Sequence, residues 1–537
     1  MNIYLGPGSY SVRFTIISEN DLKTKIILKS VSNIIENTVY IDYIPFYGEV
    51  STTRIYKMDF SIKEEYNLIY SIYLEILENT NYEVIECVIY SKNNIIHTIE
   101  KDKLKKNANI TTKYISDIDK LIPNMINIMN NNSIPNKYEY PLVSKTFDHT
   151  EIIEIIKLLL NGKQLTMGNE VKLFEEQFAE YIGSKYAVMV NSGSSANLLA
   201  VAAITNYMYI NKLNIGDEVI VPAVCWSTSV WPLLQCGLVP IFVDINLNTM
   251  NLNETILEKY ITPKTKLLFL VHIMGNCTNM EIVLNIAQKY NLLIIEDTCE
   301  SLGSSYNGKK LGNFGTFGTY SFYYSHHITT IEGGMVTCNS KEDYELLLCL
   351  RAHGWTRYFS EENKLKYKNE FPEIDTRYMF VNVGYNLRPM EIQGVMGQIQ
   401  LKKLDYYNLN RIQNFNILKN KILNHVKNNN IIYLPNEQQN SNIAWFGLCI
   451  YLTNKYSNLL AEYIDYLEKN NVETRPIVTG NFTKQPYFKI NNIVYKDEHP
   501  NADILHNTGL YIGLPCENIY FDENKINKLV DILLDFF

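Results

Sequence analysis

The sequence predicts an α/β protein in which helices cover both faces of a mostly parallel sheet. From about residue 150 onward, short apolar runs rich in β-branched residues alternate with segments long enough for helices. Such runs are typical of strands buried on both faces, and the segments between them fit the crossover connections of parallel strands. Ligands of these sheets gather at the carboxyl ends of the strands, so we searched there first for functional residues.

The expected elements follow one another along the chain. Two stretches with helical spacing come first, at residues 151–160 and 170–182. The expected strands then lie at residues 186–190, 217–223, 239–245, 266–273 and 291–297. Beyond residue 388 a long helical stretch leads into a smaller α/β region with apolar runs at 444–452 and 473–478. The alternation of strands and helices predicts one α/β sheet followed by a second, smaller one.

Residues 1–138 have a different character. They contain short β-rich runs and one helical stretch near residues 64–77, and an Asn-rich segment at 124–141 is typical of a linker. No cofactor-binding motif, metal pair or catalytic cluster is recognisable before that segment. We therefore expect an N-terminal α/β module without assigned function at 1–138, a large α/β domain at 139–390 and a small C-terminal α/β domain at 391–537.

Composition excludes several classes of protein. The chain has 537 residues, 46% of them hydrophobic and 20% charged, with a net charge of −8 and no long basic run, which argues against sequence-independent binding of nucleic acid. Its nine cysteines are scattered and form no CxxC pair, so neither a disulfide framework nor a metal site is expected. We also expect no membrane span, because no apolar run reaches about 18 residues, and a cytoplasmic location.

Candidate residues follow the first two strands. The turn "NSGSSAN" lies between the run 186–190 and an Ala/Leu-rich helix. Backbone N–H groups and hydroxyls at such a helix start, here Gly193 and Ser194, can hold a phosphate, although many such turns only cap the helix. Trp226 in "PAVCWSTSVWP" follows the next run, where its indole can stack on a flat heterocycle or can simply belong to the core or the surface.

Two later strands end on groups that can perform chemistry. The run 291–297 closes on Glu296 and Asp297, and a carboxylate at a buried strand end needs a partner, such as a pyridinium N–H or the N–H groups of the following turn. In "GTYSFYYSHHITTIEGG", Ser321 can donate to a phosphate. His326 follows five residues later, at the expected end of the same strand, and is either a structural histidine or a base.

The order and spacing of these motifs resemble the sugar aminotransferases of the DegT/DnrJ/EryC1/StrS family over residues 139–537. The resemblance implies the fold-type I fold of pyridoxal-phosphate enzymes, with a mostly parallel sheet between helices and a smaller C-terminal domain. In most members a lysine that binds the cofactor covalently occupies the position of His326. A chain without that lysine resembles the sugar 3-dehydratases of the family.

Within that subgroup, the segments "PAVCWSTS", "YSHHI", "RAHGWTR", "GYNLRPMEIQG" and "RPIVTGNF" are similar to members that act on GDP-linked 4-keto-6-deoxymannose in the colitose pathway. The other lysine-free members act on CDP-4-keto-6-deoxyglucose and carry an iron–sulfur cluster on neighbouring cysteines. After His326 this chain has only four widely spaced cysteines, Cys338, Cys349, Cys449 and Cys516, which disfavours that alternative.

The resemblance implies a role for each candidate residue. Cofactor contacts are implied for the phosphate binders Gly193, Ser194, Ser321 and Asn386 (from the other subunit), the ring-stacking Trp226, the ring-nitrogen partner Asp297, and Glu300 near the 3-hydroxyl. Substrate contacts are implied for His353, Arg388 and Arg475, with Arg388 a candidate for binding a carboxylate. His327 is left without a role.

The implied function is removal of the C3 hydroxyl of a nucleotide-linked 4-keto-6-deoxyhexose in deoxysugar biosynthesis. The cofactor would be pyridoxamine or pyridoxal 5'-phosphate held without a covalent bond, His326 would be the base, and L-glutamate would restore the amine form. We expect a homodimer that binds neither nucleic acid nor membrane, and no metal. Two alternatives stay open: a nucleotide-sugar 4-aminotransferase that acts without the lysine, and a non-catalytic protein with this fold.

Overall fold

The protein forms two compact units, Met1–Asn131 and Asn132–Phe537. This structure, a computed structural model, describes residues 137–537 except 161–163, 426–430, 494, 496 and 517–521, together with the backbone of eight strands between Asn2 and Glu100. The helices in these described ranges include none that is both long and apolar enough to cross a membrane.

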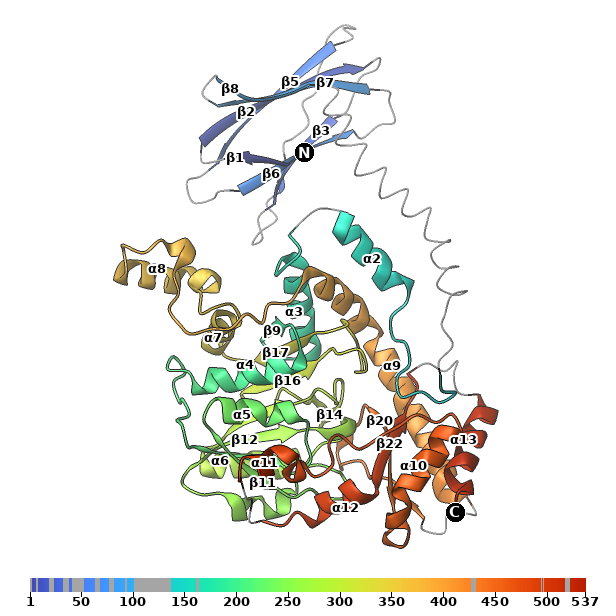
Figure 1. The fold of residues 1–537 in the computed structure, drawn as a ribbon. Coiled ribbons are helices and arrows are strands. Elements are labelled where there is room, and N and C mark those ends of the chain that lie inside the picture. The colour runs from blue at the N-terminus through green and yellow to red at the C-terminus, as the bar shows by residue number, and fades with distance from the viewer. Residues whose placement is uncertain are drawn as a thin grey trace. The chain divides into compact units, whose positions relative to one another are not determined.

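The described strands of the first unit pair in two four-stranded antiparallel sheets (Figure 1). The first sheet has the order β1 (Asn2–Leu5), β6 (Leu68–Ile76), β3 (Thr24–Val31), β4 (Thr38–Tyr40). The second has the order β5 (Thr53–Ile62), β2 (Gly8–Ser18), β7 (Tyr82–Ser91), β8 (Asn94–Glu100).

The helix expected near residues 64–77 is wrong, because residues 68–76 form strand β6. Large apolar side chains occupy every second position of that segment: Leu68, Tyr70, Ile72, Leu74 and Ile76. This period of two, together with β-branched and aromatic residues, favours a strand over a helix. The described elements of residues 2–100 are all strands, so the expected α/β character is not found in this part of the module.

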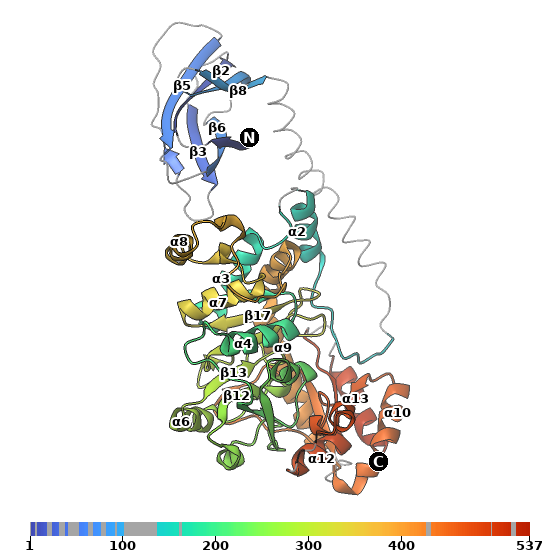
Figure 2. The same ribbon diagram turned by 60° about the vertical axis from the view of Figure 1, so that its left-hand side comes forward.

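The second unit is built on a seven-stranded sheet (Figures 1 and 2). Its order is β11 (Val239–Val243), β10 (Glu218–Pro222), β12 (Thr265–Val271), β13 (Leu293–Asp297), β16 (Phe317–Ser321), β17 (Gly334–Cys338), β9 (Tyr186–Val190). In this sheet only β17 runs against the other strands, which confirms the mostly parallel sheet and the strands expected between residues 186 and 297. Almost every residue of these strands is buried, as their continuous apolar runs predict.

Helices cover both faces of this sheet, as strand β9 illustrates. Alternate residues of a strand point to opposite faces. Val188 and Val190 pack in one core cluster with helix α4 (Gly193–Thr205), whereas Ala187 and Met189 pack in a second cluster with α3 (Asn169–Ile182). Further helices of this domain are α2 (His149–Leu160), α5 (Trp231–Gln235), α6 (Met280–Tyr290), α7 (Lys341–Arg351) and α8 (Glu361–Glu370). The helices expected at 151–160 and 170–182 are thereby confirmed as α2 and α3.

Helix α9 (Glu391–Asn424) confirms the long helix expected after residue 388 and joins the large domain to the C-terminal one. It contacts α2 and α3 near its start and α13 near its end (Figures 1 and 2). The Glu391 carboxylate accepts hydrogen bonds from the backbone N–H groups of Gly168, Glu170 and Val171 at 2.7, 2.9 and 3.1 Å. The first residue of α9 therefore caps the N-terminus of α3, where N–H groups lack partners within the helix.

In its described residues, the C-terminal domain contains a four-stranded antiparallel sheet and three larger helices. The sheet order is β18 (Ile432–Tyr433), β20 (Gly447–Leu452), β22 (Gly509–Gly513), β21 (Thr474–Arg475). The helices are α10 (Leu460–Lys469), α12 (Pro500–Thr508) and α13 (Glu523–Asp535). Shorter elements of the second unit are β14 (Ser305–Tyr306), β15 (Lys309–Lys310), β19 (Ser441–Asn442) and α11 (Pro486–Ile490).

Residues just before α2 are tied to the C-terminal domain. The Tyr140 backbone exchanges 3.0 Å hydrogen bonds with Asn471 and Glu473, and its hydroxyl donates to the Lys525 carbonyl at 3.0 Å. The Leu142 N–H donates to the Glu473 carboxylate at 3.0 Å. Any shortened chain must therefore retain Tyr140 and Leu142.

We predict that a chain beginning at Asn132 folds with the same thermal unfolding temperature as the second unit of the full protein. A chain beginning at Val143 loses the buried Tyr140 ring and its hydrogen bonds, and we expect it to be less stable by about 3 kcal/mol. Calorimetry of the three proteins measures both effects. Insolubility of the Asn132 chain, or equal stability of the two shortened chains, would contradict the prediction.

Candidate functional site

The carboxylate of Asp297 is the centre of a buried hydrogen-bond network at the carboxyl end of β13. Its Oδ2 accepts from Asn197 Nδ2 and from Ser229 Oγ, both at 2.8 Å, and its Oδ1 accepts from the Cys299 N–H at 3.1 Å. The Thr319 hydroxyl donates to Asn197 Oδ1 at 2.6 Å and so orients that amide. These three hydrogen bonds hold an almost fully buried carboxylate in one orientation.

The neighbouring Glu296 serves a different purpose. Its carboxylate accepts from the backbone N–H groups of Gly312, Phe314 and Gly315 at 2.8, 2.6 and 2.8 Å, and it lies 3.2 Å from His272 Nε2. Because successive strand residues point to opposite faces, the two acids that the sequence places side by side act on different parts of the protein.

The N-terminus of α4 lies against the end of β16. Ser192 caps the helix by accepting the Ser195 N–H at 3.1 Å, and the Ser194 hydroxyl donates to Thr228 Oγ1 at 3.2 Å. A Cβ atom added to Gly193 would lie 2.4 Å from the Ser321 Cβ and 2.8 Å from its hydroxyl. Backbone N–H groups at a helix start and the hydroxyls of Ser194 and Ser321 therefore converge, which suits an anion.

We predict that Gly193→Ala weakens the binding of pyridoxamine phosphate at least about tenfold, because the added methyl group must displace Ser321. Gly216→Ala is the matched control: the φ of Gly216 is +89°, so alanine strains the turn before β10 without touching the α4 terminus. Fluorescence titration with the cofactor measures the affinity of both variants. Equal losses of affinity in the two variants would contradict a phosphate site at the N-terminus of α4.

Trp226 lies beside the same edge of the sheet. It immediately precedes the short 3-10 helix Ser227–Ser229, whose Ser229 binds Asp297. The Trp226 side chain is 55% exposed, which excludes the core position that the sequence left open. An exposed indole next to a buried carboxylate is available for stacking on a ligand.

Glu300 follows Asp297 by three residues and is partly buried. Its Oε2 accepts the Met274 N–H at 2.9 Å. Burial raises the pKa of Glu300 to about 7, with a smaller contribution in the same direction from the Asp297 charge, against the Met274 hydrogen bond. The carboxyl group therefore exists in both protonation states near neutral pH.

His326 lies in the loop after β16, not at the end of the strand as expected, because β16 ends at Ser321. Its backbone N–H donates to the Tyr323 carbonyl at 3.0 Å, so a turn brings the imidazole back toward the sheet. The Nδ1 atom is buried and has no hydrogen-bond partner among the described groups. Burial lowers the pKa of His326 to about 4, although the Asp297 charge acts in the opposite direction. The ring is therefore neutral at physiological pH.

The adjacent His327, which had no predicted role, is structural. It is fully buried, and its Nε2 lies 2.9 Å from the Ala444 carbonyl oxygen. Burial holds the pKa of His327 well below its usual value.

His353, Asn386 and Arg388 form a second group. The His353 N–H donates to the Tyr385 carbonyl at 2.6 Å, and Ala352 forms a β-bridge with Asn386. Arg388 Nε donates to Asn386 Oδ1 at 3.0 Å, and both side chains are exposed. His353 adopts a φ of +66°, an unusual conformation for a residue with a side chain. No hydrogen bond joins this group to Asp297 or His326 among the described residues of one chain.

Arg475 lies on β21 and is exposed. Its guanidinium donates to Glu473 at 3.0 Å and to the Thr474 carbonyl at 2.7 Å. Its strand partner Tyr511 lies within the electrostatic reach of both Glu300 and Arg475, and burial is the main cause of the raised pKa of Tyr511.

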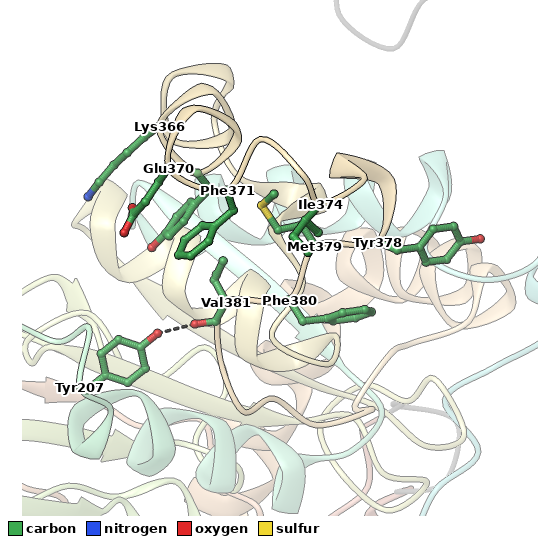
Figure 3. A pocket seen from close by; sticks show the side chains of 10 residues that line it. Tyr207, Lys366, Glu370, Phe371, Ile374, Tyr378, Met379, Phe380 and Val381 are labelled. Atoms are coloured by element: carbon green, nitrogen blue, oxygen red, sulfur yellow. Dashed lines mark hydrogen bonds between the residues drawn. The ribbon is translucent and has the colours of Figure 1, made fainter.

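A cavity of about 640 Å³ lies beside α8 (Figure 3). It is lined by Tyr207, Lys366, Tyr367, Glu370, Phe371, Ile374, Tyr378, Met379, Phe380 and Val381. The hydroxyl of Tyr207 donates to the Val381 carbonyl across it. None of the predicted site residues lines this cavity, so it is separate from the strand-end cluster.

Three residues of the Asp297 network were missed from the sequence: Asn197 and Ser229, which donate to Asp297, and Thr319, which orients Asn197. Asn197 is the one amide in the apolar segment "ANLLAVAAI" of α4, and a buried polar residue in such a helix signals a specific partner. Ser229 and Thr319 carry no comparable signal, because serine and threonine are frequent in turns and strands.

The donor set at this edge fits a phosphorylated pyridine cofactor. Asp297 accepts only neutral donors among the described residues and so can accept a further, charged N–H group. The α4 terminus offers N–H groups and hydroxyls for a phosphate, and the His326 Nδ1 lacks a partner. The described residues contain no group of three or more His, Cys, Asp or Glu side chains that could hold a metal ion.

The fold and the strand-end cluster define an aminotransferase-like protein. The profile of the DegT/DnrJ/EryC1/StrS aminotransferase family matches residues 147–531, and the chain belongs to this family. GDP-4-keto-6-deoxy-D-mannose 3-dehydratase of Escherichia coli O55:H7 is 40% identical over 375 residues, which cover 70% of this chain and 95% of that protein.

Two solved structures extend the comparison. A variant of GDP-4-keto-6-deoxymannose-3-dehydratase with bound GDP-perosamine is 37% identical, with a TM-score of 0.67, and covers 73% of this chain and 100% of its own. The same enzyme with a trapped PLP–glutamate geminal diamine has 37% identity and a TM-score of 0.65 with the same coverage. The predicted family and fold are therefore confirmed, and the residues that the family profile matches lie in the second unit.

Proposed function

We propose that this protein is a 3-dehydratase that removes the C3 hydroxyl of a GDP-linked 4-keto-6-deoxyhexose, with pyridoxamine phosphate as cofactor and L-glutamate as amino donor. The observation that carries the proposal is His326, a neutral imidazole beside Asp297 at the position where most family members have lysine. Relatives of this function support it at 37–40% identity.

The proposed cofactor site uses the strand-end residues. Gly193, Ser194 and Ser321 hold the phosphate, Trp226 covers the ring, and Asp297 accepts the ring N–H. Glu300 stands near the ring hydroxyl, where its protonation state can adjust to the charge of that group. When bound, the cofactor supplies an amine that condenses with the sugar ketone and a ring that takes up the electrons released by proton removal.

In this proposal His326 is the base that would take up a proton from the methylene carbon of the bound cofactor. An imidazole forms no stable covalent link to the cofactor, and a neutral one can accept a proton at once. No lysine stands at the position of His326 to deliver a proton to C4 of the sugar, so the electrons expel the C3 hydroxyl instead. Overall, the sugar loses one oxygen atom, and glutamate becomes 2-oxoglutarate and ammonia.

Arg388 and Arg475 are the proposed binders of substrate carboxylate or phosphate groups. Both guanidinium groups are exposed, and arginine matches the geometry of such anions. The structure of a relative with a PLP–glutamate adduct supports glutamate as the donor, and the one with GDP-perosamine supports the guanosine nucleotide. His353, held in an unusual backbone conformation near Asn386, is a proposed substrate contact.

Direct assay tests the proposal. We expect incubation with GDP-4-keto-6-deoxymannose and glutamate to yield a sugar lighter by one oxygen atom, with ammonia and 2-oxoglutarate in equal amounts. Mass spectrometry identifies the sugar. A 4-amino sugar without ammonia would identify the competing aminotransferase, and no turnover with any nucleotide-linked 4-keto sugar would favour a non-catalytic protein.

The active unit is proposed to be a cytoplasmic homodimer. The segment between α8 and α9 exposes large apolar side chains, with Tyr378 68%, Phe380 54% and Val383 89% exposed beside the cavity of Figure 3. Such a surface favours burial against another protein. Asn386 follows the same segment, so a partner subunit would bring it to the neighbouring phosphate site. The described cysteines form no disulfide, which suits a reducing compartment.

Mixed dimers test the shared site. His326→Asn and Asn386→Ala homodimers are each expected to be inactive, whereas a mixture regains part of the wild-type rate because one site of each mixed dimer has both native residues. Turnover is measured after subunit exchange is verified by native mass spectrometry. Absence of recovery despite exchange would place Asn386 in its own subunit's site.

A further inference from the structure

The segment Ala444–Phe446, which immediately precedes β20, makes hydrogen bonds with residues next to the proposed site. The Phe446 N–H donates to the Met274 carbonyl at 3.0 Å, and the Met274 N–H in turn holds Glu300. His327 Nε2 lies 2.9 Å from the Ala444 carbonyl oxygen. The C-terminal domain is thereby connected directly to the loop of His326.

The ring of Phe446 lies against both histidines. Its centroid is 5.3 Å from that of His326 and 5.7 Å from that of His327, with tilted planes. On another side it lies 6.2 Å from the Tyr511 ring. The ring therefore limits the positions that the His326 imidazole can take and excludes water from its buried Nδ1.

Arg411, on α9, holds Phe446 in place through its backbone. It is buried, with 4% of its surface exposed, and its NH1 donates to the Phe446 carbonyl at 2.9 Å. Its Nε has no hydrogen-bond partner among the described groups. Burial lowers the pKa of Arg411, but guanidinium remains charged in proteins. Burial of a charged arginine with few hydrogen-bond partners costs folding free energy. Such a residue is therefore a candidate for a functional role.

We propose that Arg411 is a positioning residue for His326: by holding the Phe446 carbonyl from α9, it keeps the Phe446 ring against the imidazole. This inference rests on the proposed role of His326 as the base. It assigns a residue that none of the sequence motifs includes, Arg411 of helix α9, to the control of the proposed proton transfer.

The charge of Arg411 also reaches the His326 imidazole. Burial is the main cause of the lowered pKa of His326, and Arg411 lowers it further, whereas Asp297 and a hydrogen bond with the Cys299 backbone raise it. Two further rings lie close to His326: His327, whose pKa is lowered by burial and by Arg411, and Tyr323, whose ring centroid lies 6.2 Å away. Arg411 therefore opposes the effect of the Asp297 charge on the pKa of His326.

The test compares Arg411→Met with Arg411→Lys in the full-length protein. NMR of protein labelled with ¹³C-histidine follows the titration of His326, whose signal is identified by its loss in His326→Asn. In Arg411→Met we expect the His326 midpoint to rise by about one pH unit, because the opposing charge is gone and the ring is less protected. Arg411→Lys keeps the charge and should show a smaller rise. A rise in Arg411→Met with no change at all in Arg411→Lys would show an effect of charge alone and would overturn the positioning role.

Kinetics give a second readout. We expect Arg411→Met to lower kcat about tenfold with little change in KM, since a displaced base slows the chemical step without weakening binding. Phe446→Leu removes the ring but keeps Arg411, so it should reproduce the loss of kcat and remains informative if Arg411→Met does not fold. An unchanged His326 midpoint and unchanged kcat in folded variants would overturn the proposal. Because the titration needs no substrate, a shifted midpoint in a protein that dehydrates no sugar would refute the proposed function alone.

Discussion

The variant His326→Asn is expected to dehydrate the sugar about 10²–10⁴ times more slowly than the wild type. Asparagine has no group that accepts a proton near neutral pH. Binding of pyridoxamine phosphate should persist, because the phosphate and ring contacts lie on α4, β13 and β16. Single-turnover kinetics and a fluorescence titration measure the two quantities separately.

Two further variants serve as controls. His149→Asn changes an imidazole at the start of α2, away from the site, and should keep the full rate. His326→Lys should form a covalent bond with pyridoxal phosphate, visible as a new absorbance band. Full dehydratase activity in His326→Asn would contradict the mechanism, and absence of the band in His326→Lys would contradict the position assigned to His326.

The low pKa of His326 also predicts how the free energy of unfolding changes with pH. Its value of about 4 in the folded protein lies below the roughly 6.5 of an unfolded histidine. The unfolded chain therefore binds more protons between these values, and this contribution to stability is lost as the pH falls from about 6.5 toward 4. In His326→Asn the free energy of unfolding should decrease less over that range than in the wild type.

The second large effect is expected for Asp297→Asn. An amide is similar in shape but carries no negative charge, so it cannot keep the cofactor ring nitrogen protonated. We expect the rate of dehydration to fall about 10³-fold and the affinity for pyridoxamine phosphate to fall about tenfold, with a small change in thermal stability. Absorbance spectra of the bound cofactor between pH 6 and 9 report the ring protonation directly.

Glu296→Gln is the matched control for this variant, because it removes the neighbouring charge. Glu296 holds the N–H groups of Gly312, Phe314 and Gly315 and lies beside His272, so we expect its loss to destabilise the fold by about 2–4 kcal/mol. Cofactor affinity per folded molecule should stay nearly unchanged. The assignment of the two acids is wrong if both variants lose affinity equally.

The sequence predicts the sheet well because its signals are local. The apolar runs 186–190 and 291–297 are strands within a residue or two, since a strand buried on both faces must be apolar throughout. The helix predicted at 64–77 is wrong for a different reason: the local pattern there has a period of two, which indicates a strand, and was interpreted as helical. His326 was expected at the end of the strand because the segment 321–327, SFYYSHH, contains no Gly, Pro, Asn or Asp to mark the turn that the His326 N–H closes on the Tyr323 carbonyl.

The site could be predicted only in part for the same reason. Asp297 is visible as an acid after an apolar run, but its partner Asn197 lies a hundred residues earlier and Ser229 in a separate turn. Their convergence follows from the order of strands in the sheet, which one sequence does not reveal. The contact of Arg411 with Phe446 depends likewise on how α9 lies against the C-terminal domain.

The cap that Glu391 places on α3 has a consequence for folding of the chain during translation. The three N–H groups that it binds belong to residues made more than two hundred positions earlier. At a translation rate of about 5–20 residues per second, α3 waits for about 10–45 s before its first turn can be completed. During that interval the nascent large domain has an incomplete helix on one face of its sheet, which is a natural point for chaperone engagement and makes the emerging chain, more than the finished protein, sensitive to substitutions at Glu391.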